Sequence, residues 1–177
     1  MRHAREDEGI LRNQTAPPCA PDDVHGVASP SSTFDQVYEA HRIRLVRTAA
    51  LITGSPDVAE ELVHEAFVEL LRRWGDVEQV GGWLRIAVVN RCRSWQRRHI
   101  LERQRAPLAD LVVHDPDGLA VRAALAVLSP RQRAAVVLRY FDDLSEADIA
   151  VALGCRPGTV KSLLARSMPK LQEALRD

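Results

Sequence analysis

The stretch that decides the fold lies near the carboxyl end, where residues 144–166 read LSEADIAVALGCRPGTVKSLLAR. Ser145 is a plausible helix N-cap, because its hydroxyl can accept a hydrogen bond from a backbone N–H of the first turn. Gly154 stands where the chain must reverse before a second helix begins. Ala150 is small where the two helices would cross, and Val160 falls on their shared apolar core. This arrangement predicts a helix-turn-helix.

The second helix of this motif carries polar and basic residues on the positions left over when the apolar ones face inward. They are Thr159, Lys161, Ser162 and Arg166, with Arg156 just before the helix. Hydroxyl, ammonium and guanidinium groups suit contacts to phosphates and to base edges in a major groove. A plain helical hairpin is the alternative. The absence of any acid from residue 156 to residue 170 favours nucleic acid.

Helix start signals recur upstream of the motif. Thr33 with Gln36 fits a capping box, and Ser55 and Ser129 are each followed by a proline at the first helical position. Apolar residues then recur at spacings of three and four. The expected helices span residues 34–53, 56–74, 83–99, 119–128, 130–141 and 146–153, and one more begins near residue 157. No run alternates with period two, so we expect an all-α protein.

Charge and proline content divide the chain into four parts. The 24 basic and 24 acidic residues give zero net charge, but the charges are unevenly placed. Residues 1–33 are proline-rich and acidic, and we expect a disordered tail. Residues 34–99 and 119–177 are predicted to form two small helical domains. Residues 100–118, with two prolines and an acidic balance, are predicted to be a flexible linker.

A second acid-free stretch lies in the first domain, from residue 85 to residue 98. It places a tryptophan among arginines, a pattern that can follow a nucleic-acid backbone and stack on an unpaired base. The candidate residues there are Arg91, Arg93, Trp95, Arg97 and Arg98. Neutral overall charge therefore does not exclude DNA as a partner.

Taken together, the two halves resemble the bacterial extracytoplasmic-function (group IV) sigma factors of the sigma-70 family. The resemblance covers about residues 34–175. The first domain carries it in YEAHR (38–42), LITG (51–54), AEELVHEAF (59–67) and WLRIAVVN (83–90). The second carries it in LSPRQR (128–133), LRY (138–140), LS (144–145), IA (149–150) and GTVKS (158–162).

The resemblance implies a protein that joins core RNA polymerase and recognises the −35 and −10 elements of promoter DNA. In that family, the helix matching residues 59–74 binds polymerase. The residues of this chain that the implication covers are Glu60, Glu61, Leu62, His64, Glu65 and Phe67. The loop matching residues 75–82, with Asn90, would receive a flipped base during melting, and Lys161, Ser162 and Arg166 match positions that contact the −35 element. The family also implies an anti-sigma factor as a partner, often a membrane-tethered one.

Three departures from the family pattern stand out. Arg156 replaces a small hydroxyl residue, so the recognition helix should lack its usual N-cap and Arg156 could reach a phosphate instead. Leu163 replaces a basic residue, which would weaken DNA contact or add packing. Pro169 should kink or end the last helix, because it cannot donate a backbone hydrogen bond.

Other classes of protein are less well supported by the sequence. Cysteines and histidines lack the spacing of metal ligands, and the common catalytic and phosphate-binding motifs do not occur, so we expect no metal, cofactor, small-molecule substrate or enzymatic activity. The cysteine usage favours a reduced, cytoplasmic chain. Two alternatives remain at this point. One is an autonomous helix-turn-helix regulator, and the other is a sigma-like protein that acts mainly through a regulatory partner.

Overall fold

A computed structural model describes residues 33–103 and 116–176, and within them every regular element is a helix. The helices are α1 (Phe34–Thr53), α2 (Pro56–Arg72), α3 (Val80–Arg103), α4 (Pro116–Ala126), α5 (Pro130–Tyr140), α6 (Glu146–Leu153) and α7 (Pro157–Ala174). The prediction of an all-α protein is confirmed for this part of the chain. None of the helices described here is both long and apolar enough to cross a membrane.

Two sequence-based expectations fall wholly or partly outside the described residues. The tail assigned to residues 1–33 is described only at Thr33, and most of the linker assigned to residues 100–118 is not described. The ends of the expected linker are helical, since α3 continues to Arg103 and α4 already begins at Pro116.

The helix boundaries follow the local signals in the sequence. The Thr33 hydroxyl accepts from the backbone of Gln36 while the Gln36 side chain accepts from the backbone of Thr33, which completes the predicted capping box. Ser129 and Gln132 form the same reciprocal pair at the start of α5. Ser55 caps α2 through the backbone N–H of Val58. These bonds satisfy N–H groups that have no partner within the helix.

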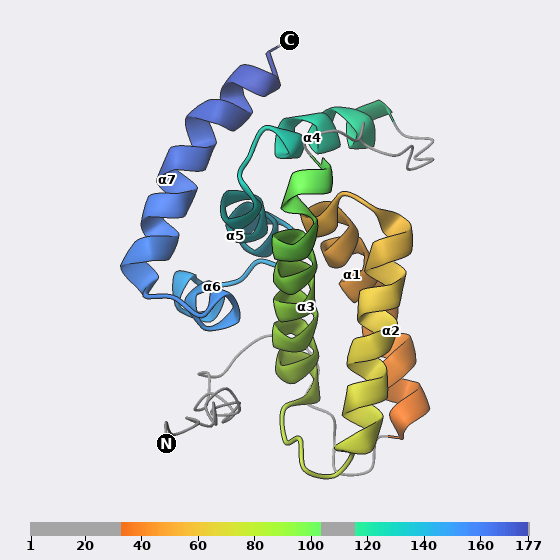
Figure 1. Ribbon diagram of the computed structural model, residues 1–177. Coiled ribbons are helices and arrows are strands. Elements are labelled where there is room, and N and C mark those ends of the chain that lie inside the picture. Colours follow the sequence, from red (N-terminus) through yellow and green to blue (C-terminus); the bar gives the residue numbers. More distant parts are fainter. Residues whose placement is uncertain (1–32, 104–115, 177) are drawn as a thin grey trace, which may run out of the picture.

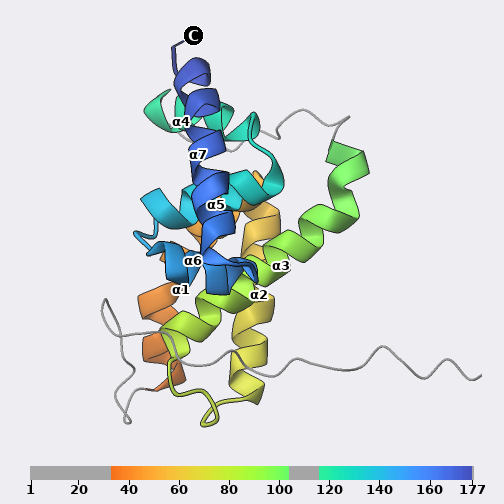
Figure 2. The same cartoon turned by 90° about the vertical axis from the view of Figure 1, so that its left-hand side faces the viewer.

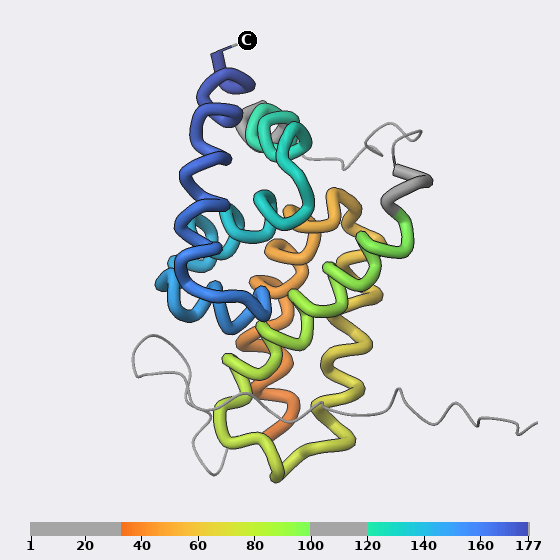
Figure 3. Tube along the Cα trace, turned by 60° about the vertical axis from the view of Figure 1, so that its left-hand side comes forward, coloured from red at the N-terminus to blue at the C-terminus, as the bar shows by residue number. Residues whose placement is uncertain are grey.

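The helices form two units that pack directly on each other. In the first unit, α1 packs against α2 and α3, and α2 packs against α3; in the second, α5, α6 and α7 pack together and α4 covers α7. Across the seam α1 meets α5, and α3 meets both α5 and α6. Figure 1 shows α6 beside the middle of α3, and the turned views of Figures 2 and 3 keep the two helices adjacent. The buried apolar side chains of both units form one continuous cluster.

The helix-turn-helix is present as the sequence predicts. Ser145 caps α6, and Gly154 turns the chain with a φ of 56°, in the left-handed region that glycine adopts readily. Ile149, Leu153 and Val160 are all fully buried in the angle between α6 and α7. The apolar spacing read from the sequence therefore places the polar face of α7 outward.

Three details differ from the sequence-based expectations. Helix α3 begins at Val80 rather than at residue 83, because Val80 is buried and the Trp83 backbone N–H already bonds to the Gln79 carbonyl. Leu71 and Trp74 continue the apolar spacing expected over residues 56–74 but are 57% and 39% exposed, because the burial of α2 ends at Leu70. Pro169 was expected to kink or end the last helix, and it does not end it.

Helix α7 continues through Pro169 to Ala174. Side-chain bonds support the helix on both sides of the proline. The Ser167 hydroxyl donates to the Leu163 carbonyl at 2.7 Å, and the Lys170 ammonium donates to Gln132 on α5 at 3.3 Å. A missing backbone donor in a helix interior is thus tolerated where α7 packs along α5.

Replacing Leu153 by Ala should destabilise the second unit strongly. The Leu153 side chain extends from α6 and is fully buried, so its truncation leaves a cavity. We expect the free energy of unfolding to fall by about 2–5 kcal/mol, measured by urea denaturation that is monitored by circular dichroism. Val151→Ala, on the same helix but 37% exposed, is the matched control and should cost less than about 1 kcal/mol. Equal losses from the two variants would contradict this account of the α6 core.

The two described cysteines should differ sharply in reactivity. Burial raises the pKa of the Cys92 thiol to about 12, so in the native protein it stays protonated, and it is also inaccessible. Cys155 is half-buried in the turn before α7. Iodoacetamide at a pH of about 8 should label Cys155 at least tenfold faster than Cys92, as read by peptide mass spectrometry. The difference should vanish in urea; comparable native rates would show that α3 is not packed as described.

Candidate nucleic-acid interface

The outer face of α7 presents every residue that the sequence analysis assigned to it. Arg156, Thr159, Lys161, Ser162 and Arg166 are all exposed, and no ion pair to a described residue is formed by the three cationic groups among them. The Ser162 hydroxyl donates to the Gly158 carbonyl at 3.0 Å, which fixes its rotamer on the helix surface. The face therefore offers three free cations and two hydroxyls to a partner.

Two of the expected departures in α7 have visible consequences. The N-cap position is held by Arg156 with extended backbone and no side-chain cap bond. Pro157 has no backbone N–H and the Thr159 N–H donates to the Arg156 carbonyl at 2.9 Å, so the first turn offers an anion the Gly158 N–H together with the Arg156 guanidinium. Leu163 is half-buried against the apolar cluster. Of the two outcomes considered for Leu163, packing is the one that the structure shows.

The basic stretch of α3 is divided among different surroundings. Asn90, Arg97 and Arg98 are exposed. Arg91 instead bridges to α2, with its Nε 3.5 Å from Glu65 Oε2 and its terminal nitrogen bonded to Glu69. Trp95 is half-buried and stacks on His99 with ring centroids 4.8 Å apart. Arg91 therefore holds α2 and α3 together, and only part of the predicted set faces solvent.

Arg93 lies at the seam between the two units. Its terminal nitrogen bonds the Asn90 side chain at 3.5 Å and lies 3.9 Å from the position that a Cβ on Gly154, in the turn before α7, would take. Burial, with smaller contributions from Arg131 and Arg97, lowers the pKa of Arg93. The helix-turn-helix thus sits against the same α3 face that carries part of the predicted nucleic-acid stretch.

The six residues predicted to bind polymerase fall into two groups on α2. Glu60, Glu61, His64 and Glu65 are exposed, although Glu60 pairs with Arg42 and Glu65 with Arg91. Leu62 and Phe67 are only 4% and 2% exposed. Because these two face the core of the first unit, they support the surface from beneath rather than form it.

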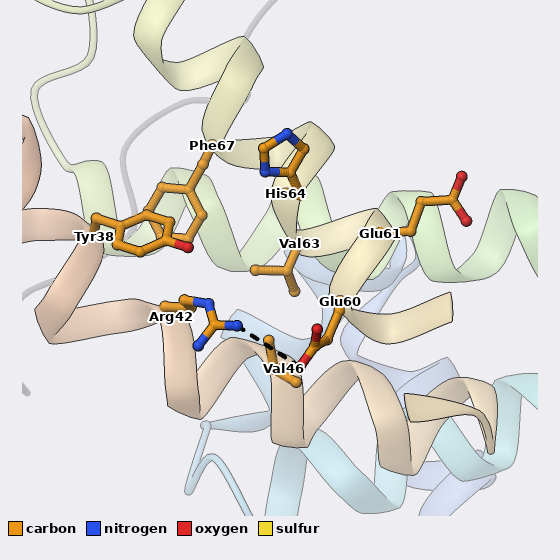
Figure 4. Close-up of a pocket in the computed structure, with 8 residues that line it drawn as sticks. All are labelled: Tyr38, Arg42, Val46, Glu60, Glu61, Val63, His64 and Phe67. Carbon is orange, nitrogen blue, oxygen red and sulfur yellow. Dashed lines mark ion pairs between the residues drawn. The ribbon is translucent and has the colours of Figure 1, made fainter. Parts of the chain in front are cut away.

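A hollow of about 280 Å³ opens between α1 and α2 beside the exposed group (Figure 4). At one end, Tyr38 packs on Phe67 with ring centroids 4.8 Å apart. Arg42 lies 5.9 Å from the Tyr38 ring centroid and pairs with Glu60 at 3.7 Å. The hollow combines an aromatic floor with a rim of charge, which suits a protein side chain better than a metal ion. The described residues contain no group of three or more His, Cys, Asp and Glu side chains that could hold a metal.

The structure also brings together polar residues that the sequence analysis did not single out. His41 and Arg44 of α1, Arg85 of α3 and Asp142 beyond α5 line a hollow of about 240 Å³ at the seam. Arg85 begins the acid-free stretch of α3, and this was the one available signal in the sequence. Asp142 contacts residues of α1 that lie almost a hundred positions away in the sequence, so no local sequence pattern predicts this contact.

Comparison with known proteins supplies the family. Residues 37–100 match Sigma-70 region 2, and residues 118–171 match Sigma-70 region 4. The chain is 30% identical over 151 residues to "RNA polymerase sigma-E factor" of Streptomyces coelicolor, covering 80% of this chain and 85% of that protein. It is 33% identical over 182 residues to "ECF RNA polymerase sigma factor SigM" of Mycobacterium tuberculosis, covering 98% of this chain and 87% of that protein.

Solved structures agree with this comparison. The fold is similar to the sigma factor RpoE of Bartonella quintana, determined in complex with the anti-sigma factor NepR. The TM-score is 0.69 and the identity 26%, covering 81% of this chain and 96% of that one. CnrH, determined with the cytosolic domain of CnrY, shares the fold at a TM-score of 0.61, with 20% identity and coverage of 81% and 87%. The order of the two matched regions, the helix-turn-helix and the whole-length relatives therefore agree: the chain belongs to the sigma-70 family, among the ECF RNA polymerase sigma factors.

Proposed function

We propose that this chain is a promoter-specificity subunit: it joins core RNA polymerase and directs initiation by recognising −35 and −10 elements. The observation that carries the proposal is the presence, in one chain and in order, of the two matched sigma-70 regions, the second ending in a helix with an exposed and unpaired basic face. Such a protein supplies binding and positioning, so we further propose that it has no catalytic activity of its own.

We assign −35 recognition to α7. Lys161 and Arg166 supply cations for phosphates and guanine edges, and Thr159 and Ser162 supply hydroxyls that can bond to either. Arg156 is placed for a phosphate at the helix N-terminus. The first helix of the motif, α6, would then cross the DNA backbone, as it does in other helix-turn-helix proteins.

We assign recognition of the −10 element to the exposed part of α3 and to the loop before it. The exposed Asn90 accepts from Arg93 through its amide oxygen and keeps its amide nitrogen for a base edge. Arg97 and Arg98 can follow a strand's phosphates. Trp95 stacks on His99 and packs against the apolar cluster, so we assign it a smaller part in contacting an unpaired base. Arg91 is assigned a supporting role, because it pairs with two carboxylates of α2 and donates to the Ala87 carbonyl of its own helix.

We assign polymerase binding to the exposed charged group of α2 and the adjoining hollow. A regulatory partner is also proposed: the similar solved structures contain sigma factors held by anti-sigma proteins. An anti-sigma protein that covers α2 or α7 would block one or both of the proposed interfaces. We place the protein in the cytoplasm, where core polymerase and promoter DNA are found.

Alanine substitutions in α7 test the −35 assignment. Lys161→Ala and Arg166→Ala should each cost about 1–3 kcal/mol of promoter binding, because each removes a contact to a base edge or phosphate. The measurement is initiation by polymerase reconstituted with the protein's own core enzyme, together with core binding, which should be unchanged. Arg176→Ala, an exposed arginine beyond the end of α7, is the charge-matched control. The proposal fails if the wild-type protein directs no promoter-specific initiation.

A charge reversal on α2 tests the polymerase interface. Glu61→Arg places a large cation at the rim of the hollow between α1 and α2, where a complementary partner would meet the wrong charge. We expect core-enzyme affinity to fall at least tenfold, which is about 1.4 kcal/mol, in a pull-down or anisotropy titration. Glu39→Arg, the same change at an exposed site on α1, is the control and should bind normally. If both variants bind core equally well, the interface lies elsewhere.

A further inference from the structure

The seam between the two units is centred on a buried carboxylate. Asp142 follows α5 and is only 6% exposed. Its carboxylate accepts hydrogen bonds from the Thr48 hydroxyl at 3.1 and 3.2 Å and from Arg44 Nε at 3.1 Å. A second Arg44 nitrogen donates to the Asp142 backbone carbonyl at 2.9 Å. Thr48 and Arg44 both belong to α1, so a carboxylate of the second unit is held entirely by donors of the first.

The receiving surface carries more positive charge than Asp142 neutralises. His41, Arg44 and Arg85 all line the same hollow of about 240 Å³. Arg85 is half-buried and forms no ion pair or hydrogen bond with a described residue. Burial, followed by Arg85 and Arg44, lowers the pKa of His41, which places the three basic side chains within electrostatic reach of one another.

The acids that face this cluster come from the second unit. Burial lowers the pKa of Arg85, while Asp142 and, more weakly, Asp148 act in the opposite direction. Asp148 lies in the first turn of α6. Arg85 therefore loses both acidic partners, Asp142 and Asp148, when the second unit moves away. The first unit then keeps Arg44 and Arg85 in a concave site, and their charge is no longer compensated by these acids.

We propose that His41, Arg44 and Arg85 form a binding site for a backbone phosphate of promoter DNA, and that the Asp142 carboxylate occupies this site when the two units are packed together. The inference rests on the proposed function, because it identifies a further DNA contact on the unit assigned to the −10 element. Arg85 opens the acid-free stretch of α3, so the phosphate site lies on the same helix as Asn90, Arg97 and Arg98.

The two occupants exclude each other, since one concave site cannot hold a carboxylate and a phosphate together. A phosphate can then bind only to the molecules in which Asp142 has left the site. The apparent DNA affinity of the free protein is lower than the intrinsic affinity of the site in proportion to that fraction. The contact at the seam and the contact to DNA therefore compete for the same basic residues, and the zero net charge of the chain gives no sign of either contact.

Substitution of Asp142 provides the test, with the full chain and no polymerase. The probe is a fluorescein-labelled single-stranded DNA of mixed sequence, titrated by anisotropy at low salt. Asp142→Asn keeps the size of the side chain but removes the competing charge, and it should tighten DNA binding at least threefold. Adding Arg85→Gln to this variant should reverse the gain and lower the salt dependence of log K by about 0.7, the value for one phosphate on a single strand.

Matched variants separate this site from a general charge effect. Asp143→Asn makes the same charge change at the next residue, which is exposed and has a φ of 52° that Asn adopts readily, and it should leave affinity unchanged. Thr48→Val removes the hydroxyl that donates to the Asp142 carboxylate without altering any charge, and it should also tighten DNA binding. Arg72→Gln, at an exposed position of α2, is the control for the loss of one arginine in the Asp142→Asn background.

The inference is overturned if Asp142→Asn and Asp143→Asn change affinity equally, or if Arg85→Gln acts no differently from Arg72→Gln. Because this assay contains no polymerase, its failure leaves the initiation test untouched. Conversely, a chain that fails to initiate transcription but shows the Asp142 and Arg85 effects keeps its phosphate site and loses the proposed function.

Discussion

A carboxylate that is removed from water must be given donors and countercharge. Asp142 receives hydrogen bonds from Arg44 and Thr48 of α1, and countercharge from Arg44 and from Arg85 of α3. The group is held by one hydroxyl and one guanidinium, so its position fixes the end of α5 against α1. The units also meet where α6 lies on α3 and where the turn at Gly154 approaches Arg93. A buried ion pair adds less to stability than its Coulomb attraction suggests, because desolvation opposes it. Its contribution here is to select one arrangement of two units that share an apolar core.

Most of the local structure could be predicted from the sequence, because its determinants lie within four residues of each other. The capping boxes at Thr33 and Ser129 and the left-handed turn at Gly154 were all identifiable from residue type and spacing. The start of α3 was misplaced because a buried Val80 outweighs the two glycines that follow it. Leu71 fits the apolar stripe of α2 but extends past the last helix that could cover it, and periodicity cannot show where a neighbouring helix ends.

The candidate interfaces were predictable to different degrees for the same reason. The face of α7 follows from helical geometry once Val160 and Leu164 are turned inward, so all five of its residues were found. The stretch on α3 was only partly resolved, since a sequence cannot show that Arg91 pairs with glutamates more than twenty residues away. The cluster around Asp142 was missed altogether. It joins α1, α3 and the end of α5, and no spacing rule connects segments that meet only through packing.

The bridge from Arg91 to Glu65 and Glu69 has a mechanical consequence. Helices α2 and α3 pack on each other and are also joined by one cation, which contacts glutamates on successive turns of α2. These ion pairs oppose sliding of one helix past the other. A partner that binds the exposed side of α2 therefore acts on two helices at once, because a displacement of α2 is passed to α3 through Arg91.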